Sequence, residues 1–297
     1  MPTYTHTIPT DPPRQRVDAY ALRVFAALPS RKQARKMIKA ERLLINDKPC
    51  NSAWFVRPGD TMTLTLSDAP RLKVLELKVA VRYEDPYLAV VDKPAGLHVR
   101  GNFVRTLHRA LRHNLTLSSA PDALPDPDPV HRLDYRTQGL VLIARTATAR
   151  ARLGQMFERR QIHKRYRALV LGRLEGSGEV DAPIDGRPAR SQWRAVAHTR
   201  SLRTDWLTTV DLFPVTGRTH QLRRHMTGLG HPILGDDLYH NGQIYRHNGL
   251  FLCAVAQRFD HPITQEAVHV ERSEPDKFSS HRKREDRRWR RWHHGEA

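Results

Sequence analysis

The feature that most constrains the fold is a series of apolar, strand-like runs between residues 87 and 259. They are YLAVVDKPAG (87–96), GLVLIA (139–144), YRALVLG (166–172), WLTTVDLF (206–213) and LFLCAVAQRF (250–259). Two helical patterns interrupt them, TLHRALRHNL (106–115) and the amphipathic TATARARLGQMFERR (146–160). Strands and helices follow no regular βαβ period. We therefore predict an α+β domain with a mixed, largely antiparallel β-sheet flanked by helices.

Changes in composition suggest where the domains begin and end. We predict a flexible, proline-rich leader over 1–13, a small domain over 14–67, a linker over 68–80, the large domain over 81–272 and a basic C-terminal tail over 273–297. Inside the large domain, APDALPDPDP (120–129) holds four of the chain's 20 prolines in ten residues. We expect that segment to be a surface loop.

The small domain has two helical patterns followed by two short strand patterns. Ser30 is placed to cap the second helix, RKQARKMIKAE (31–41), in which Ala34, Met37 and Ile38 can face inward. Its outward face is basic, and we take three residues of that face as candidate RNA contacts: Arg31, Arg35 and Lys36. The alternative is a basic face that is only solvated.

The order of these elements resembles the small RNA-binding module shared by a small-subunit ribosomal protein and tyrosyl-tRNA synthetases. The resemblance is carried by RVD (16–18), SRKQARKMI (30–38), LLINDKP (43–49) and VRPGDTMTL (56–64). It implies a small N-terminal α/β RNA-binding domain. Glu41 and Asp47 stand where that pattern usually has glycine.

Charge also indicates a nucleic-acid partner. Lys and Arg number 50 against 31 Asp and Glu, which gives a net charge of +19 and a pI near 10.6. A protein this basic usually binds a polyanion, with RNA or DNA the first candidate. The tail HRKREDRRWRRWHH (281–294) interleaves arginines with two tryptophans. It suits either nonspecific RNA contact or a disordered, solubilising tail.

The remaining sequence signals favour a soluble cytoplasmic protein with no membrane partner. No run approaches the roughly 20 apolar residues of a membrane span, and the N-terminus lacks the apolar core of a signal peptide. Cys50 and Cys253 are far apart and read as reduced thiols. His220, His225 and His231 have the wrong spacing for a shared helix face and no acid or cysteine completes a set, so we expect no metal site.

The stretch HRLDYRTQGLVLIART (131–146) resembles the catalytic-aspartate motif of pseudouridine synthases of the RluA type. Four further segments are similar to that family's motifs, in its order: LAVVDKPAGLHV (88–99), IHKRYRALVLG (162–172), GRTHQLRRHMTGLGHPILGDDLY (217–239) and LFLCAVAQRFDHPIT (250–264). Tyr135 stands where the family often has arginine, and Gln138 replaces its usual serine. The large domain is thus identified as a pseudouridine synthase catalytic domain.

The resemblance implies an isomerase that detaches uracil from ribose, rotates it and rejoins it through carbon. No atom is gained or lost, so neither cofactor nor metal is expected. By the family's pattern Asp134 is the reactive group, attacking covalently or abstracting a proton, and Arg218 pairs with it. Tyr166 would stack on the uracil and help to remove the proton from carbon 5, and Leu222 would line the pocket.

RNA recognition is assigned by the same resemblance. Arg132 would fill the space that a flipped-out uridine leaves, and residues 137–139, beginning with Thr137, would form the turn into a rigid strand. His131 is open between RNA contact and a structural hydrogen bond. We expect a monomer that modifies large-subunit ribosomal RNA, with transfer RNA as the other possible substrate. The alternatives are an inactive RNA-binding or ribosome-assembly factor on the same scaffold, and a general polyanion binder.

Overall fold

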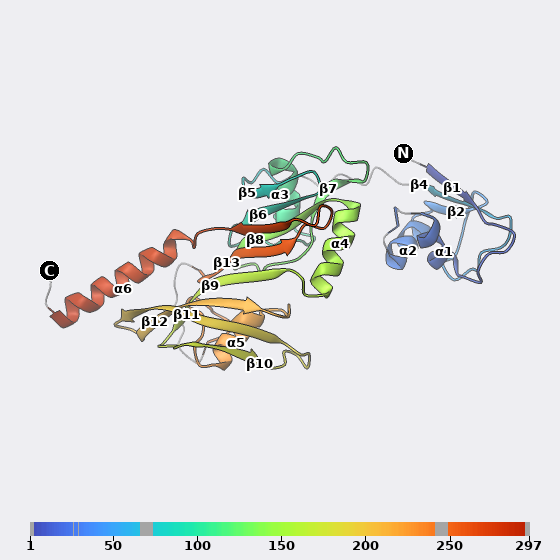
Figure 1. The fold of residues 1–297 in the computed structure, drawn as a ribbon. Coiled ribbons are helices and arrows are strands. Elements are labelled where there is room, and N and C mark those ends of the chain that lie inside the picture. The colour runs from blue at the N-terminus through green and yellow to red at the C-terminus, as the bar shows by residue number, and fades with distance from the viewer. Residues whose placement is uncertain (1–2, 26, 29, 66–73, 241–248, 295–297) are drawn as a thin grey trace. The chain divides into compact units, whose positions relative to one another are not determined.

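The computed structural model (Figure 1) describes residues 3–25, 27–28, 30–65, 74–240 and 249–294. The chain divides into two compact units, Met1–Leu72 and Lys73–Ala297. Of the expected linker, residues 68–73 lie outside the described residues. Leu75 and Leu77 are partly buried and pack against the second unit's core, and the Leu77 carbonyl accepts a hydrogen bond from the side chain of Asn114 at 2.8 Å.

The first unit is a four-stranded sheet with two helices, α1 (Val17–Val24) and α2 (Arg31–Lys39). The sheet order is β1-β4-β2-β3, with bounds Thr3–Thr7, Thr61–Thr65, Leu43–Ile45 and Lys48–Pro49. The prediction of a loose leader is wrong for Thr3–Thr7, which pairs antiparallel with β4. The free edge of β4 offers unpaired N–H and C=O groups, and the threonine-rich segment satisfies them as a strand.

The helices of this unit confirm the local signals. Ala34, Met37 and Ile38 are buried as predicted, and the Ser30 hydroxyl accepts a hydrogen bond from the Gln33 amide at 3.3 Å. Glu41 and Asp47, which replace the usual glycines, have φ of 53° and 58°. Both therefore adopt the left-handed conformation that glycine would adopt more readily.

The second unit confirms the predicted fold class. Its ten-stranded sheet has the order β10-β11-β12-β9-β13-β8-β6-β5, with β14 beside β13 and β7 beside β8. Among the described strand pairs only that of β13 with β8 is parallel. The bounds are β5 Ala80–Glu84, β6 Leu88–Lys93, β7 Ala123–Pro129, β8 Gln138–Thr146, β9 His163–Leu171, β10 Ser177–Asp181, β11 Arg190–Ser201, β12 Asp205–Pro214, β13 Leu252–Asp260 and β14 Ala267–Glu271.

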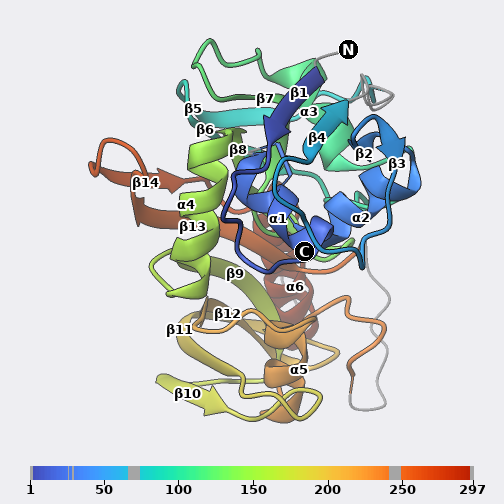
Figure 2. The same cartoon turned by 90° about the vertical axis from the view of Figure 1, so that its right-hand side faces the viewer.

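Helices cover both faces of this sheet (Figure 2). Helices α3 (Leu107–Asn114) and α5 (Gln221–Gly228) place Leu111 and Met226 in one apolar cluster with the β-strands. Helix α4 (Ala147–Glu158) packs Leu153 into a second cluster, which takes the alternate residues of β6 and β8. The segment that carries Asp134 leads into β8, which lies between these two apolar clusters.

Two predictions in this unit are corrected. Residues Ala123–Pro129 form strand β7 instead of a loop. Its prolines occupy positions 125, 127 and 129, so the N–H groups that they lack all belong to one edge of the strand. Among the described elements β7 pairs only with β8, as an edge strand, and an edge strand tolerates prolines. The disordered alternative for the basic tail is also wrong for Asp276–His294, which forms helix α6 and buries Phe278. None of the described helices is long and apolar enough to cross a membrane.

Candidate active site

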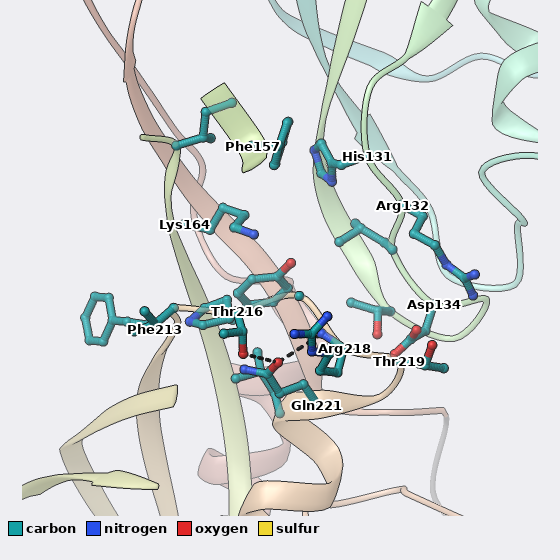
Figure 3. Close-up of a pocket in the computed structure, with 18 of the residues that line it drawn as sticks. His131, Arg132, Asp134, Phe157, Lys164, Phe213, Thr216, Arg218, Thr219 and Gln221 are labelled. Atoms are coloured by element: carbon teal, nitrogen blue, oxygen red, sulfur yellow. Dashed lines mark hydrogen bonds between the residues drawn. The ribbon is translucent and has the colours of Figure 1, made fainter. Parts of the chain in front are cut away.

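A cavity of about 800 Å³ opens between the β7–β8 connection, the end of α4, the start of β9 and the turn that precedes α5 (Figure 3). Seven of the predicted site residues line it: His131, Arg132, Asp134, Thr137, Tyr166, Arg218 and Leu222. The lining also has five Lys or Arg side chains against two carboxylates, those of Asp134 and Glu158. Such a cavity favours an anionic ligand with an apolar part.

The position of Asp134 is fixed by the chain on both sides of it. Leu133 is buried, and the Thr137 amide donates to the Asp134 carbonyl at 3.1 Å. Gly139 has φ of 117°, and a Cβ there would lie 2.2 Å from the Ala254 carbonyl oxygen of β13. Only glycine allows β8 to approach β13 this closely, which holds the Asp134 turn at the end of the parallel strand pair.

The Asp134 carboxylate forms no ion pair with an arginine of the described ranges. The basic group that faces it is His220, whose Nε2 lies 3.8 Å from Oδ1. The expected pairing with Arg218 is therefore not formed. The Arg218 Nε donates instead to the carbonyl of Pro188, which lies two residues before β11, at 3.0 Å. The sequence neighbour Arg136 forms an ion pair with Asp237.

Gln221 holds the turn that carries Arg218. Its side-chain oxygen accepts from the Thr216 hydroxyl at 2.7 Å and from the Arg218 amide at 2.9 Å. Its side-chain nitrogen donates to the Arg190 carbonyl and to Ser191 Oγ at 2.9 and 2.8 Å. A buried amide with every bond satisfied makes this turn rigid. Helix α5 starts at Gln221, with the left-handed His220 before it.

Tyr166 forms the floor of the cavity on β9. Its ring is 9% exposed, and its hydroxyl has no hydrogen bond to the residues that the structure describes. Burial and then the negative charge of Asp134 raise the pKa of Tyr166. The phenol therefore stays protonated at neutral pH and can donate a hydrogen bond. The buried Thr137 Oγ1 also lacks a partner within the described chain.

Lys164 and His131 form the other wall (Figure 3). The Lys164 ammonium lies 5.4 Å from the Phe157 ring centroid, and burial lowers its pKa. His131 Nε2 accepts from the Leu142 amide at 3.0 Å and faces Gln257 Nε2 at 3.2 Å. Burial, then the charge of Lys164, lowers the pKa of His131 to about 3. His131 thus makes a structural hydrogen bond, one of its two predicted roles, and it also lines the cavity.

A buried lysine lies behind the Asp134 turn. Lys93, which is 0% exposed, donates through Nζ to the carbonyls of Leu97, Pro94 and Tyr135 at 2.8, 3.0 and 3.4 Å. Burial lowers the pKa of Lys93 to about 8, although the charge of Asp134 raises it. The ammonium therefore ties the KPAG turn to the residue that follows Asp134 and contributes a positive field there.

The three histidines considered as metal ligands have separate roles. His225 is buried and contacts Ser191 Oγ and the Ala182 carbonyl at 2.9 and 3.1 Å, whereas His231 contacts the Leu171 carbonyl at 2.9 Å. His220 faces Asp134 and Tyr239. Across the described ranges no group of three or more His, Cys, Asp or Glu side chains could hold a metal ion. The nearby buried cation, Arg223, is bound by Asp236 through two hydrogen bonds of 2.7 Å.

The three candidate RNA contacts of the first unit lie on α2, and none of them is among the residues that line this cavity. Arg31 Nη2 and Arg35 Nε bind the carboxylate of Asp18 on α1 at 2.9 and 2.6 Å. Their side chains remain about half exposed, and Lys36 is exposed. The two arginines therefore join the helices of this unit as well as facing solvent.

Lys93, Lys164, His220 and Gln221 were not among the predicted site residues. Lys93 lies in the motif KPAG, and His220 and Gln221 lie in GRTHQL, so membership of these motifs was the sequence signal that could have identified them. Lys164 lies two residues before Tyr166, and side chains two apart on a strand share a face. That spacing alone would have placed it in the pocket.

Comparison with known proteins matches both units to described families. Residues 87–227 match the family described as RNA pseudouridylate synthase, and residues 15–62 match the S4 domain. The Bacillus subtilis protein "Uncharacterized RNA pseudouridine synthase YlyB" is 32% identical over 83% of this chain and 86% of its own length. The Vibrio parahaemolyticus "Ribosomal large subunit pseudouridine synthase D" is 31% identical over 92% of this chain and 91% of its own.

The solved structure "Human RNA Pseudouridylate Synthase Domain Containing 1" is similar in fold. It superposes with a TM-score of 0.56 at 27% identity, over 68% of this chain and 84% of that one. The resemblance inferred from the five sequence motifs is confirmed by these matches, as is the resemblance of the N-terminal unit to a small RNA-binding module.

Proposed function

The chain belongs to the RNA pseudouridylate synthase family, and from that premise we propose that it isomerises uridines of large-subunit ribosomal RNA, with Asp134 as the reactive group. The observation that carries the proposal is the arrangement around this carboxylate. It lies in a basic cavity of about 800 Å³, on a turn fixed by Gly139, and it faces a histidine at 3.8 Å instead of a bound guanidinium. A carboxylate with free lone pairs beside a base-sized cavity is suited to attack or proton abstraction.

Asp134 acts first in the proposed mechanism. It attacks the ribose or takes a proton from it, which breaks the bond between N1 of uracil and the ribose. The detached base then turns within the cavity, and its carbon 5 forms the new bond to the ribose as the bond to Asp134 breaks or as the abstracted proton returns to the ribose. The carbon-5 proton leaves, and N1 gains one, so no atom is gained or lost overall. We expect no cofactor and no metal for this sequence of steps.

Tyr166 and Leu222 hold the detached base. Both are buried and line the cavity, at 9% and 7% exposure, so an aromatic ring and an aliphatic side chain are available to contact the uracil faces. The raised pKa of Tyr166 favours a neutral phenol that donates a hydrogen bond. We assign to Tyr166 orientation of the base and, once carbon 5 is bonded to the ribose, help in removing the carbon-5 proton.

Arg218 completes the site when RNA enters. Its Nε is bound to the Pro188 carbonyl, whereas its two terminal nitrogens form no hydrogen bond or ion pair with the described residues. The residue lines the same cavity as Asp134 (Figure 3). A guanidinium that turns to the carboxylate would stabilise the ionised form and orient it. The rigid Gln221 anchor keeps the Arg218 backbone in place during that movement.

Arg132 contacts the RNA around the target. It is exposed at the mouth of the cavity, two residues before Asp134, and it can enter the stack that the uridine leaves. Thr137 presents a buried hydroxyl, without a partner in the described chain, to the cavity, which suits a polar atom of the nucleotide. The N-terminal unit adds a second RNA-binding surface through the exposed face of α2, with Arg31, Arg35 and Lys36.

The choice of ribosomal RNA rests on the relatives. The Vibrio parahaemolyticus protein named for the ribosomal large subunit matches nearly the full length of this chain, including the N-terminal unit. We place the protein in the cytoplasm as a monomer, and transfer RNA is the second candidate substrate. Membership of an enzyme family and the presence of Asp134, Tyr166 and Arg218 favour an enzyme over an inactive RNA-binding factor on the same scaffold.

Mapping pseudouridine in total RNA tests this function. RNA from cells with the gene deleted is compared with RNA from cells that carry the wild-type protein or Asp134→Asn. We expect one or a few large-subunit positions to lose pseudouridine in the deletion and to regain it only with the wild type. Losses confined to transfer RNA would identify transfer RNA as the substrate in place of ribosomal RNA, and an unchanged map would reject the proposal.

A further inference from the structure

Three aromatic rings form a stack outside the cavity, beside the Asp134 turn. Phe103 and Tyr135 are 59% and 49% exposed, unusually high values for large rings. The His98 ring contacts both of them, stacked on the Phe103 ring and tilted against the Tyr135 ring. Its centroid is 4.9 Å from that of Phe103, with ring planes 15° apart, and 4.6 Å from that of Tyr135, with planes 38° apart. The Phe103 and Tyr135 rings thus keep much of their surface open to solvent.

The loop that carries Phe103 is held in shape at its base. The Leu107 amide donates to the His98 carbonyl at 2.7 Å, and His98 forms a bridge with Thr106. Gly101 has φ of 147°, and a Cβ there would lie 3.0 Å from Cδ2 of Phe103. The glycine lets the ring lie against the backbone, so Phe103 is supported from below and exposed above.

The other end of the stack is tied to the reactive carboxylate. Tyr135 directly follows Asp134, and its carbonyl accepts from the Gly96 amide at 2.8 Å and from Lys93 Nζ at 3.4 Å. Tyr135 does not line the cavity, in contrast to Asp134. Its ring therefore lies outside the cavity, while the carboxylate of the preceding residue lies inside it.

The charges around the stack match a nucleic-acid backbone. Arg105 and Arg132 are exposed, and the side chain of Arg100 is half exposed while it is anchored to Asp128. Rings interleaved with arginines bind unpaired nucleotides, because bases stack on the rings and phosphates meet the guanidiniums. An apolar protein partner would not need the cations, and a packed core would not leave the rings exposed.

We propose that the stack of His98, Phe103 and Tyr135 is a binding site for an unpaired nucleobase adjacent to the target uridine. This rests on the proposed function, since it concerns the RNA that presents the uridine to Asp134. Flipping a uridine breaks its stacking with both neighbours, and an external ring stack restores that stacking for one of them. The site would thereby favour targets whose neighbour is unpaired, with purines stacking best.

A fluorescent base analogue tests the stack directly. The probe is a hairpin RNA with a central uridine in its unpaired loop and 2-aminopurine on the 5′ or the 3′ side of it. Stacking quenches 2-aminopurine fluorescence, and the full-length Asp134→Asn protein is used so that the uridine is not converted. We expect quenching at one of the two flanking positions upon binding.

The variants separate stacking from general apolar contact. Phe103→Ala and Tyr135→Ala should each weaken binding about tenfold and reduce the quenching, without changing the salt dependence of binding, because stacking releases no counterions. Phe103→Leu should behave as Phe103→Ala. Leu117→Ala is the matched control, since it removes another exposed apolar side chain, 52% exposed, from the same unit and should have no effect.

An abasic nucleotide completes the test. Replacing the quenched position by an abasic residue should weaken wild-type binding about tenfold and have no further effect in Phe103→Ala. Absence of quenching on both sides, or equal losses for Phe103→Ala and Leu117→Ala, would reject the stack. Quenching by a protein that makes no pseudouridine in any cellular RNA would reject the proposed function and leave the stack standing.

Discussion

Asp18 in the N-terminal unit and Asp134 in the cavity are both aspartates in arginine-rich surroundings, and the structure treats them in opposite ways. The Asp18 side chain is 1% exposed and is bound by Arg31 and Arg35 at 2.9 and 2.6 Å. The Asp134 side chain is 18% exposed, and the basic group that faces it, on His220, is 3.8 Å away. A carboxylate whose oxygens are both bound by arginines joins two helices, whereas a carboxylate without such bonds keeps lone pairs that a substrate can use.

The pKa of Asp18 shows the balance behind the first case. Burial by itself raises this pKa. The hydrogen bonds and the charges of Arg31 and Arg35 together lower it by more than burial raises it, so that the pKa lies below the ordinary value of 3.8. Asp18 thus contributes stability at pH values above 3.8, and that contribution is lost as the pH falls through its lower folded-state pKa.

Asp134→Asn should have the largest effect, because it removes the carboxylate that we propose as the reactive group and keeps its shape. We expect kcat to fall on the order of 10⁴-fold, RNA affinity to change little, and the free energy of unfolding to stay within about 0.5 kcal/mol of wild type. Single-turnover kinetics and urea unfolding measure these quantities. Glu158→Gln is the matched control, since it neutralises the other, exposed carboxylate of the cavity. Equal losses in the two variants would contradict a special role for Asp134.

Lys93→Met tests the positive charge of the Lys93 ammonium behind the Asp134 turn. We expect kcat to fall roughly 100-fold, of the order seen when a fixed electrostatic contact is removed. In the wild type, activity should decline above pH 8, because the pKa of Lys93 is about 8 and the ammonium loses its proton there. The variant should show a flat profile across that range.

The effect of Lys93 on stability has the opposite sign. Its folded pKa lies below its ordinary value of 10.5, so between about pH 8 and 10.5 the unfolded state binds more protons, and this group's contribution to stability rises with pH. A decline in activity without a parallel fall in melting temperature therefore distinguishes a positioning role from unfolding. A variant that keeps the wild-type decline would assign it to another group.

Asp18→Asn should affect stability alone. We expect the N-terminal unit to lose about 2 kcal/mol, less than a fully buried pair would, because the arginines can be solvated when the carboxylate is neutralised. Hydrogen exchange of the α1 and α2 amides reports this locally, and the difference from wild type should shrink at pH values below 3.8. Asp185→Asn, on an exposed carboxylate, is the control. A change in kcat comparable to that of Asp134→Asn would remove the contrast.

Replacing the lysines of α2 should have the smallest effect. Lys32, Lys36 and Lys39 are exposed on the helix whose two arginines bind Asp18. Their joint change to Gln should weaken RNA binding several-fold at low salt and reduce the slope of log affinity against log salt by about 0.7–0.9 for each phosphate that is no longer neutralised. Changing the same lysines to Arg keeps the charge and should preserve both values. An unchanged slope would mean that α2 does not bind RNA.

The local elements of the fold were predictable because each depends on neighbours in the sequence. Periodicity identified the α2 core residues Ala34, Met37 and Ile38, and Ser30 was identified as its cap. Strand β7 was missed because a proline-rich segment has strand geometry only when another strand, here β8, accepts it at one edge. Strand β1 was missed for the same reason, with β4 as its partner.

The candidate site divides along the same line. The motifs identified residues that the structure gathers around one cavity, although they come from positions as far apart as His131 and Leu222. The direction of the side chains was not predictable from the motifs. Arg218 donates to Pro188, His220 approaches Asp134, and Lys164 reaches the cavity from β9.

The sequence by itself therefore determined the chemical groups, the helices and strands that carry them, and the family to which they belong. Only the tertiary structure decided that Asp18 would be saturated by arginines and Asp134 left open. The physical reason is that a hydrogen bond or ion pair depends on a few ångströms between side chains distant in sequence. Those distances are set by packing, such as the approach of β8 to β13 at Gly139, and no local pattern encodes them.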